Sequence, residues 1–210
     1  MNHYYRKSVI PKSVEEGFIK LIDPLVNFFV KLDVHPNTFT VWGLILSLVG
    51  AGFLAAGHIH LGGLFILLGG ICDVFDGKIA RKSNKVSKFG ALLDSSLDRY
   101  AEIFMFLGAA IYLVRLDYFL TSVMIFIALG GSSMVSYVRA RAEGLGFDCK
   151  VGLMQRPERV VLMGVAALFH HYLLIGAVWI IAVLANYTAY QRIKYVYDKS
   201  KEMNSDDSIN

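Results

Sequence analysis

Charged residues, proline and cysteine are scarce in this sequence of 210 residues. Asp, Glu, Lys and Arg make up 18% of the chain, hydrophobic residues make up 55%, and there are 4 prolines and 2 cysteines. Cys72 and Cys149 are too few for the disulfide framework of a small secreted domain. So little charge on so apolar a chain is not typical of a soluble domain. It indicates a membrane protein that crosses the bilayer several times.

The apolar residues form long runs rather than short alternating segments. A helix needs about 20 residues to cross a hydrocarbon core of ~30 Å. The candidate runs are 39–57, 61–80, 89–114, 118–140, 157–173 and 174–193. We therefore predict an all-α fold, in which residues 39–196 form a bundle of six transmembrane helices. Only His170 and His171 separate the last two runs, so their boundary is the least defined.

The two ends of the chain are expected to lie outside this bundle. Residues 14–33 place apolar side chains at helical spacing, which predicts an interfacial amphipathic helix within a cytoplasmic segment 1–38. This helix should be bent or broken near Pro24, and the alternative is a helix that packs on the rest of the protein. Polar residues dominate 197–210, where we expect a disordered tail.

The basic residues indicate an orientation in the membrane. They are concentrated before the first run, in the connection 81–88, around 139–159 and after the last run. By the positive-inside rule, both termini and the two basic connections face the cytoplasm. The net charge of +4 then reflects topology and contact with anionic membrane lipids, and nucleic acid is not an expected partner. We expect a multi-pass protein of the cytoplasmic membrane.

Four aspartates lie beside these apolar runs. Asp73 and Asp76 are three residues apart near the end of the second run, and Asp94 and Asp98 are four apart near the start of the third. On helices each pair shares one face, and the short basic connection predicts a hairpin that brings the pairs together. Four carboxylates at such close range repel strongly in a low dielectric. Positive charge must lie among them, or several must be protonated.

Hard divalent cations suit such a site best. Mg²⁺ and Mn²⁺ take oxygen ligands, and two ions held by aspartates are a common arrangement for phosphoryl transfer. Intramembrane acids also serve proton relays, ion pathways and buried ion pairs, for which Arg81 and Arg99 are candidate partners. A small ion or proton transporter and a structural membrane anchor are therefore alternatives. The transporter is disfavoured because charge is confined to the cytoplasmic ends of the runs.

The spacing of these residues forms a longer motif. The pattern Asp73-x2-Asp76-Gly77-x2-Ala80-Arg81-x8-Gly90-x3-Asp94-x3-Asp98 resembles the signature of the CDP-alcohol phosphatidyltransferase family at every defined position. The stretch 35–40, His-Pro-Asn-Thr-Phe-Thr, resembles the Pro-Asn-x-x-Thr element of the same family. The resemblance implies six membrane helices, a preceding juxtamembrane helix and a homodimer.

The resemblance also implies a reaction, in which an alcohol displaces CMP from a CDP-linked lipid. The implied metal ligands for two Mg²⁺ or Mn²⁺ ions are Asp73, Asp76, Asp94 and Asp98. Asp98 would also act as the general base, and Gly90 would let the helices approach closely. The implied contacts of the CDP group are Asn37, Thr40, Asp73, Gly77, Ala80 and Arg81.

Basic residues elsewhere bear on the acceptor alcohol. The candidates for binding an acceptor phosphate are Arg139, Arg141, Arg156 and Arg159. They either anchor helices at the inner membrane surface or bind an anion, since Arg contacts phosphate in a bidentate manner. We favour the second interpretation and thus a phosphorylated polyol. Segments 136–144 and 156–159 resemble the phosphatidylinositol-phosphate synthase branch, which implies CDP-diacylglycerol and inositol 1-phosphate as substrates, with glycerol 3-phosphate as the alternative acceptor.

Overall fold

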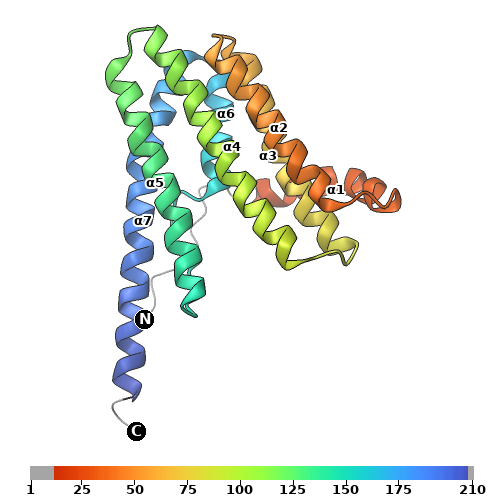
Figure 1. Ribbon diagram of the computed structural model, residues 1–210, viewed down its shortest axis with the longest axis vertical. Coiled ribbons are helices and arrows are strands. Elements are labelled where there is room, and N and C mark those ends of the chain that lie inside the picture. Colours follow the sequence, from red (N-terminus) through yellow and green to blue (C-terminus); the bar gives the residue numbers. More distant parts are fainter. Residues whose placement is uncertain (1–11, 208–210) are drawn as a thin grey trace.

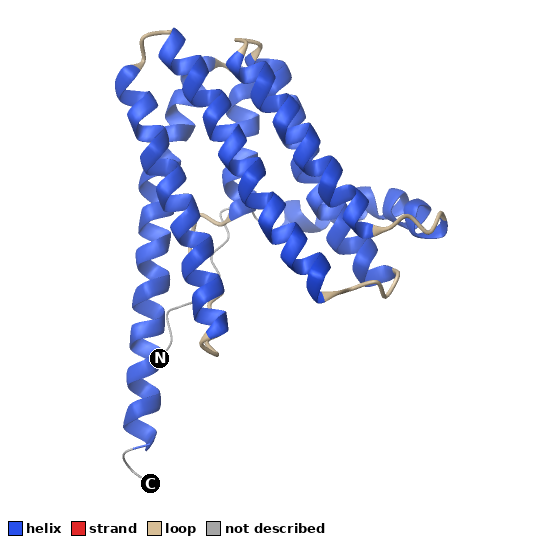
Figure 2. Ribbon diagram, in the orientation of Figure 1, coloured by secondary structure: helices blue, strands red, loops and turns tan. Residues whose placement is uncertain are grey.

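The computed structural model describes residues 12–207, which are folded into α-helices without any strand (Figures 1 and 2). The seven helices of this part of the chain are α1 (Lys12–Lys31), α2 (Pro36–Ala55), α3 (Ile59–Lys82), α4 (Lys88–Arg115), α5 (Phe119–Gly144), α6 (Arg156–Phe169) and α7 (His171–Asp207). The all-α prediction is confirmed. The weakly defined boundary near His170 is also real, because α6 ends at Phe169 and α7 begins at His171.

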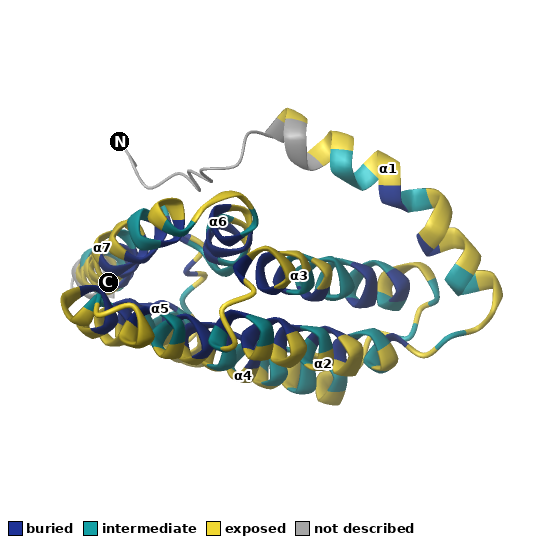
Figure 3. Cartoon of the chain, turned by 90° about the horizontal axis from the view of Figure 1, so that it is seen from above, coloured by how far each residue is buried: buried dark blue, intermediate teal, exposed yellow. Residues whose placement is uncertain are grey.

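Helices α2 to α7 are arranged in two facing rows (Figure 3). The first row contains α3, α6 and α7, and the second contains α2, α4 and α5. Within the rows α6 packs on α3 and α7, and α4 packs on α2 and α5; at the two ends α2 packs on α3, and α5 on α7. The six helices therefore form a closed ring, in which α4 and α6 are the middle helices of the two rows.

Local signals explain where these helices begin and end. Ser87 caps α4, because its hydroxyl accepts a hydrogen bond from the Gly90 N–H at 2.9 Å. Pro36 lies in the first turn of α2, where the missing N–H costs no hydrogen bond. Left-handed residues other than glycine follow three helices: Asp33 after α1 and Asn84 after α3, both with φ of 55°, and Asp117 after α4 with φ of 60°. Asp and Asn tolerate this conformation better than most residues.

Four of the helices are long and apolar enough to cross a membrane, namely α2, α3, α5 and α7. Helix α4 spans 28 residues, but several charged side chains fall within it. Helix α6 has 14 residues, which at 1.5 Å per residue gives a length of about 21 Å. Each of the six predicted runs therefore has its helix, and the four that qualify by length and composition make this a protein with several membrane-spanning segments.

The C-terminal segment differs from the expected disordered tail over 197–210. Helix α7 continues to Asp207, beyond the apolar part of its sequence. Directly before this segment, Tyr195 and Val196 pack against a small cluster that contains Cys149. Residues 1–11 and 208–210 lie outside the described part of the chain.

Helix α1 packs against the end of α3, outside the ring. Its apolar contacts join Ile22 and Val26 to Phe75 and Ile79. Ion pairs flank this cluster, from Asp23 to Lys78 at 2.8 Å and from Asp33 to Lys85 at 2.6 Å. The hydrogen bond from Lys78 lowers the pKa of the Asp23 carboxyl. Pro24 lies inside the helix, so the predicted break there is absent.

The face of α1 that points away from α3 is also apolar. Its exposed large side chains are Leu21, Leu25 and Phe28, and exposed Leu32 directly follows the helix. They follow one another at spacings of three and four residues, which places them along one side of a helix. Helix α1 thus has one apolar side on the protein and another that no described residue covers.

Small residues set the distance between several pairs of helices. A Cβ atom at Gly63 of α3 would lie 2.5 Å from the carbonyl oxygen of Gly164 and 2.6 Å from the backbone nitrogen of Leu168, both in α6. Neither backbone atom can move without shifting its helix. Gly52 of α2, in contrast, has no atom within 4 Å of its Cβ position.

We predict that Gly63→Ala lowers the thermal unfolding midpoint of the detergent-solubilised protein, because α3 and α6 must separate. The expected loss is about 1–3 kcal/mol, as for other overpacked sites. Gly52→Ala is the matched control and should keep or slightly raise the midpoint, since Ala favours a helix more than Gly does. Equal midpoints for the two variants would contradict this account of the packing.

Candidate active site

The four aspartates of the motif lie on two consecutive helices. Asp73 and Asp76 are in α3, which ends at Lys82, and Asp94 and Asp98 are in α4, which begins at Lys88. Both pairs are therefore two to three turns from the loop that joins the helices, at 3.6 residues per turn. The predicted hairpin is present, at the same end of the ring as α1 (Figure 1).

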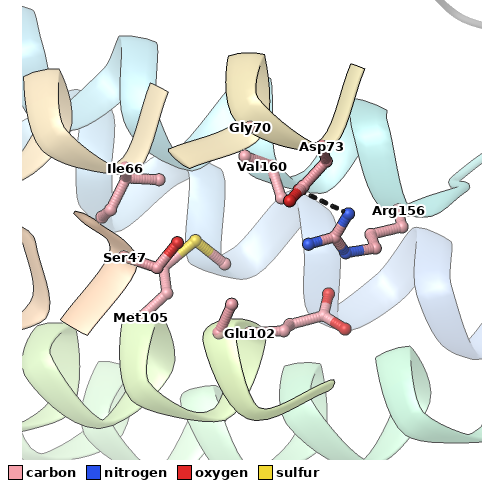
Figure 4. A pocket seen from close by; sticks show the side chains of 9 residues that line it. Ser47, Ile66, Gly70, Asp73, Glu102, Met105, Arg156 and Val160 are labelled. Atoms are coloured by element: carbon pink, nitrogen blue, oxygen red, sulfur yellow. Dashed lines mark ion pairs between the residues drawn. The ribbon is translucent and has the colours of Figure 1, made fainter. Parts of the chain in front are cut away.

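Arg156, the first residue of α6, joins the two aspartate pairs. Its guanidinium Nη1 is 2.8 Å from Asp73 Oδ2, and its Nη2 is 2.8 Å from Asp98 Oδ1. The side chains of Arg156, Asp73 and Asp98 are 18%, 16% and 12% exposed, so water screens these contacts only weakly. Figure 4 shows the Arg156–Asp73 contact at the edge of a small cavity. Helices α3, α4 and α6 thus meet at the Arg156 guanidinium.

Asp76 has a different partner. Its Oδ2 accepts a hydrogen bond from the Thr40 hydroxyl of α2 at 2.7 Å, and both residues are buried. Thr40 was predicted to contact CDP, and here its hydroxyl orients Asp76. Asn37 lies one turn earlier in α2 and faces α4, because a Cβ atom at Gly90 would be 3.3 Å from Asn37 Oδ1. A side chain at Gly90 would therefore crowd the Asn37 amide and the Ser87 hydroxyl.

Gly77, Ala80 and Arg81 occupy the last turns of α3. A Cβ atom at Gly77 would meet only the guanidinium of Arg81, at 3.6 Å, which is ordinary van der Waals contact. The packing of the protein therefore does not require glycine at this position. Arg81 is exposed, and Gly77 and Ala80 are partly exposed. This end of α3 presents open backbone and one guanidinium to a ligand.

The donor set suits a hard divalent cation. Four carboxylates lie on two neighbouring helices, and oxygen is the ligand that Mg²⁺ and Mn²⁺ prefer. Within residues 12–207, no three His, Cys, Asp or Glu side chains are gathered around a single point, and Asp73 and Asp98 are paired with Arg156. The Arg156 guanidinium lies where the negative charge of the carboxylates has to be balanced. The residues therefore fit a metal site, both by their oxygen ligands and by their need for positive charge.

The structure places the four predicted acceptor residues in different surroundings. Arg156 is in the aspartate site. Arg139 is paired with Glu143 at 2.8 Å in the last turns of α5, and Arg141 is exposed nearby. Arg159 is fully buried and paired with Glu102 of α4. Of these four, only Arg156 contacts the aspartates directly, and Arg99 of α4 lies 3.7 Å from Asp98 Oδ2 as a further ion-pair partner.

Glu102, Arg192 and Gly43 were not among the predicted site residues. Glu102 continues the four-residue spacing of Asp94 and Asp98, a signal that was available in the sequence. Arg192 of α7 is buried and donates to the carbonyl oxygen of Val151 at 2.9 Å. A Cβ atom at Gly43 of α2 would lie 2.7 Å from Asp73 Oδ1, so this glycine makes room for the carboxylate. No sequence pattern indicated the last two roles.

Several buried polar atoms of the described residues lack a hydrogen-bond partner. They include Arg156 Nε, Gln155 Nε2, Gln191 Oε1 and Ser132 Oγ. Gln155 and Gln191 directly precede Arg156 and Arg192 in the sequence. Unsatisfied buried polar atoms are rare in proteins and call for a ligand, water or ion. They occur here on α5, α7 and the start of α6.

Comparison with known proteins agrees with this geometry. The model of the CDP-alcohol phosphatidyltransferase family matches residues 33–190. The phosphatidylinositol phosphate synthase of Mycobacteroides abscessus is 33% identical over 189 residues, which are 86% of this chain and 86% of that protein. The archaetidylinositol phosphate synthase of Methanothermobacter thermautotrophicus is 30% identical over 186 residues, covering 87% of this chain and 91% of that protein.

Solved structures extend the likeness to three dimensions. The phosphatidylinositol phosphate synthase of Mycobacterium tuberculosis with CDP-DAG bound has a TM-score of 0.76 and 26% identity, covering 85% of this chain and 94% of that one. A structure of the same enzyme in complex with manganese and citrate has a TM-score of 0.73, covering 83% and 88%. The matched region includes all four aspartates and Arg156, and the chain belongs to the CDP-alcohol phosphatidyltransferase family.

Proposed function

We propose that this protein transfers a phosphatidyl group from CDP-diacylglycerol to inositol 1-phosphate and releases CMP. The observation that carries the proposal is the bridge from Arg156 to Asp73 and Asp98, 2.8 Å on each side. It puts an anion-binding guanidinium next to the carboxylates of the family signature. A phosphorylated alcohol bound there would have its hydroxyl beside a carboxylate base.

The names of the relatives support the identity of the acceptor more strongly than the identity of the lipid substrate. One group consists of phosphatidylinositol phosphate synthases and another of archaetidylinositol phosphate synthases. The two names share the inositol phosphate part and differ in the lipid part. Inositol 1-phosphate is therefore our acceptor, and CDP-diacylglycerol is supported by the solved relative that binds CDP-DAG.

The metal ions are assigned to the four aspartates Asp73, Asp76, Asp94 and Asp98. Two divalent cations bound there would neutralise charge on the diphosphate and stabilise the leaving CMP. Gly43 makes room for Asp73, and Thr40 orients Asp76 through its hydrogen bond. The protein thus holds two of the proposed ligands from α2, a helix without any acidic residue of its own.

The open end of α3 is assigned to the CDP group. Gly77 and Ala80 would allow the nucleotide to approach the helix backbone, and Arg81 would contact the phosphates. Asn37, which faces α4 near Gly90, would contact the nucleotide from α2. This arrangement puts CDP between α2, α3 and α4.

Asp98 is the proposed general base. Its carboxylate accepts from Arg156, so a phosphate on Arg156 would bring the acceptor hydroxyl close to Asp98. A carboxylate is a weak base for an alcohol, and positioning must compensate for this weakness. Arg139 and Arg141 are proposed to extend the anion pocket toward the end of α5, where they would attract the acceptor phosphate.

We further propose that α4 and α6 also cross the membrane, which gives six spans with both termini and the site at the cytoplasmic side. The exposed apolar side of α1 would then lie in the membrane interface. A homodimer is proposed on the family resemblance, and exposed apolar side chains on α4 and α5 are compatible with it. A site at the cytoplasmic side of the membrane would let the lipid tails stay in the bilayer while the lipid headgroup meets a soluble acceptor.

Release of CMP from CDP-diacylglycerol, assayed against a panel of acceptors with Mn²⁺, tests the function. We expect release with inositol 1-phosphate and none after the metal is chelated. CMP release only with glycerol 3-phosphate would make that compound the acceptor in place of inositol 1-phosphate. The absence of release with every acceptor would instead favour a transporter or a membrane anchor.

For the base, we predict that Asp98→Asn lowers kcat by about 10²–10⁴-fold, the usual contribution of a general base. Folding and Mn²⁺ binding should be largely intact, because Asn preserves the shape and three carboxylates remain. CMP release and Mn²⁺ binding are measured on the same preparation. Near wild-type turnover would exclude Asp98 as the base.

For the acceptor pocket, Arg156→Ala should raise the KM for inositol 1-phosphate at least about tenfold, the equivalent of one lost charged contact. The KM for CDP-diacylglycerol should change much less. Lys150→Ala is the control, since Lys150 is exposed and paired with Asp148 on the same connection. Equal changes in both KM values, or none, would argue against the assignment.

For the metal site, Gly43→Ala should weaken Mn²⁺ binding, because the new Cβ atom would displace the Asp73 carboxylate. The expected loss of affinity is about 10–100-fold, as for other residues that orient metal ligands. Binding is followed by electron paramagnetic resonance of free Mn²⁺, with Gly52→Ala of the same helix as control. Unchanged affinity in Gly43→Ala would remove Asp73 from the ligand set.

A further inference from the structure

A second ion pair lies behind the aspartate site. Arg159 of α6 donates from Nε to Glu102 Oε1 at 2.5 Å and from Nη2 to Oε2 at 3.1 Å. Its Nη1 donates to the carbonyl oxygen of Met154 at 3.0 Å. Arg159 is 0% and Glu102 4% exposed. We call Glu102–Arg159 the inner pair and Asp98–Arg156 the outer pair.

The two pairs connect the same two helices about one turn apart. Glu102 follows Asp98 by four residues in α4, and Arg159 follows Arg156 by three residues in α6. Such spacings place both members on one side of each helix. Helix α6 packs chiefly on α3 and α7, and α4 chiefly on α2 and α5. The pairs are therefore direct polar links between the middle helices of the two rows.

The inner pair holds the backbone on both sides of Arg156. Met154 precedes Arg156 by two residues, and Arg159 follows it by three. Through its three contacts, Arg159 in the first turn of α6 is joined to the loop before α6 at Met154 and to α4 at Glu102. Figure 4 shows the Glu102 carboxylate and the Arg156 guanidinium on the same side of the small cavity that both residues line.

Arg159 does not have the surroundings of a residue that binds substrate directly. Its side chain is fully buried, and both of its terminal nitrogens and its Nε already have partners. Stability alone is a weak explanation for the pair, because desolvation of two buried charges offsets most of their attraction. A bidentate contact does, however, define one relative position of two helices more sharply than apolar packing does.

We propose that Glu102 is a positioning residue of the acceptor site: through its buried bidentate pair with Arg159 it sets the register of α6 against α4 and so places Arg156 between Asp73 and Asp98. The proposal rests on the proposed function, in which Arg156 binds the acceptor phosphate. It assigns Arg159 to the placement of Arg156 and removes it from direct contact with the phosphate.

The experiment is a double-variant cycle with Glu102→Gln and Arg156→Ala, assayed by CMP release. Glu102→Gln alone should raise the KM for inositol 1-phosphate at least tenfold, while the KM for CDP-diacylglycerol stays within twofold. In the Arg156→Ala background, Glu102→Gln should add nothing to the acceptor KM, because it acts through Arg156. Glu202→Gln, which breaks the exposed pair with Lys199, is the control and should change neither constant.

A second variant covers the case in which Glu102→Gln does not fold because Arg159 is left with a reduced partner. Glu102→Leu combined with Arg159→Met removes both charges and leaves no unpaired ion in the interior. It should fold, bind CDP-diacylglycerol normally and show the same rise in acceptor KM. A wild-type acceptor KM in this folded variant would overturn the proposal.

The outcomes separate this inference from the proposed function. If Glu102→Gln raises the acceptor KM equally with and without Arg156, Glu102 acts independently of Arg156 and the inference is wrong. If Arg156→Ala itself leaves the acceptor KM unchanged, the assignment of the phosphate pocket is wrong. The single Arg156→Ala variant therefore decides which of the two has failed.

Discussion

The repulsion among four carboxylates on two neighbouring helices is the constraint on which the rest of this site depends. Asp73, Asp76, Asp94 and Asp98 lie where water screens poorly, so their charge has to be balanced locally. Arg156 supplies one positive charge between Asp73 and Asp98. The divalent ions on which this family of transferases depends would supply the rest. Because Arg156 is the first residue of α6, this helix has to begin at the level of the aspartates. Its packing between α3 and α7 in the ring holds it there.

Close packing of small residues makes that arrangement possible. Gly43 leaves room for the Asp73 carboxylate, and Gly63 lets α6 approach α3. A side chain at either position would move a helix or a ligand that the chemistry requires. In contrast, Gly77 is not required by packing, because a Cβ atom there would meet only the Arg81 guanidinium at an ordinary distance. Packing thus requires glycine at Gly43 and Gly63, whereas at Gly77 we propose that glycine leaves space for the nucleotide.

Much of the fold followed from patterns along the chain. Apolar runs predicted α2 to α7 because each span must satisfy its backbone hydrogen bonds internally, and spacings of three and four residues predicted that the aspartates share helix faces. The errors were at the ends. The polar composition of 197–210 suggested disorder, but α7 continues to Asp207. Pro24 suggested a bend or a break in α1, and the helix is not broken there.

The sequence by itself determined the class of the protein, the family signature and the two aspartate pairs, because these depend on composition and on spacing within single helices. Only the tertiary structure decided which partner each arginine has and how deeply it is buried. Four of them had the same appearance in the sequence, yet Arg156 contacts the aspartates, Arg159 is buried on Glu102, and Arg139 pairs with Glu143 at the surface. The physical reason is that burial and partner depend on which helices meet across the ring, and these helices are distant in the sequence.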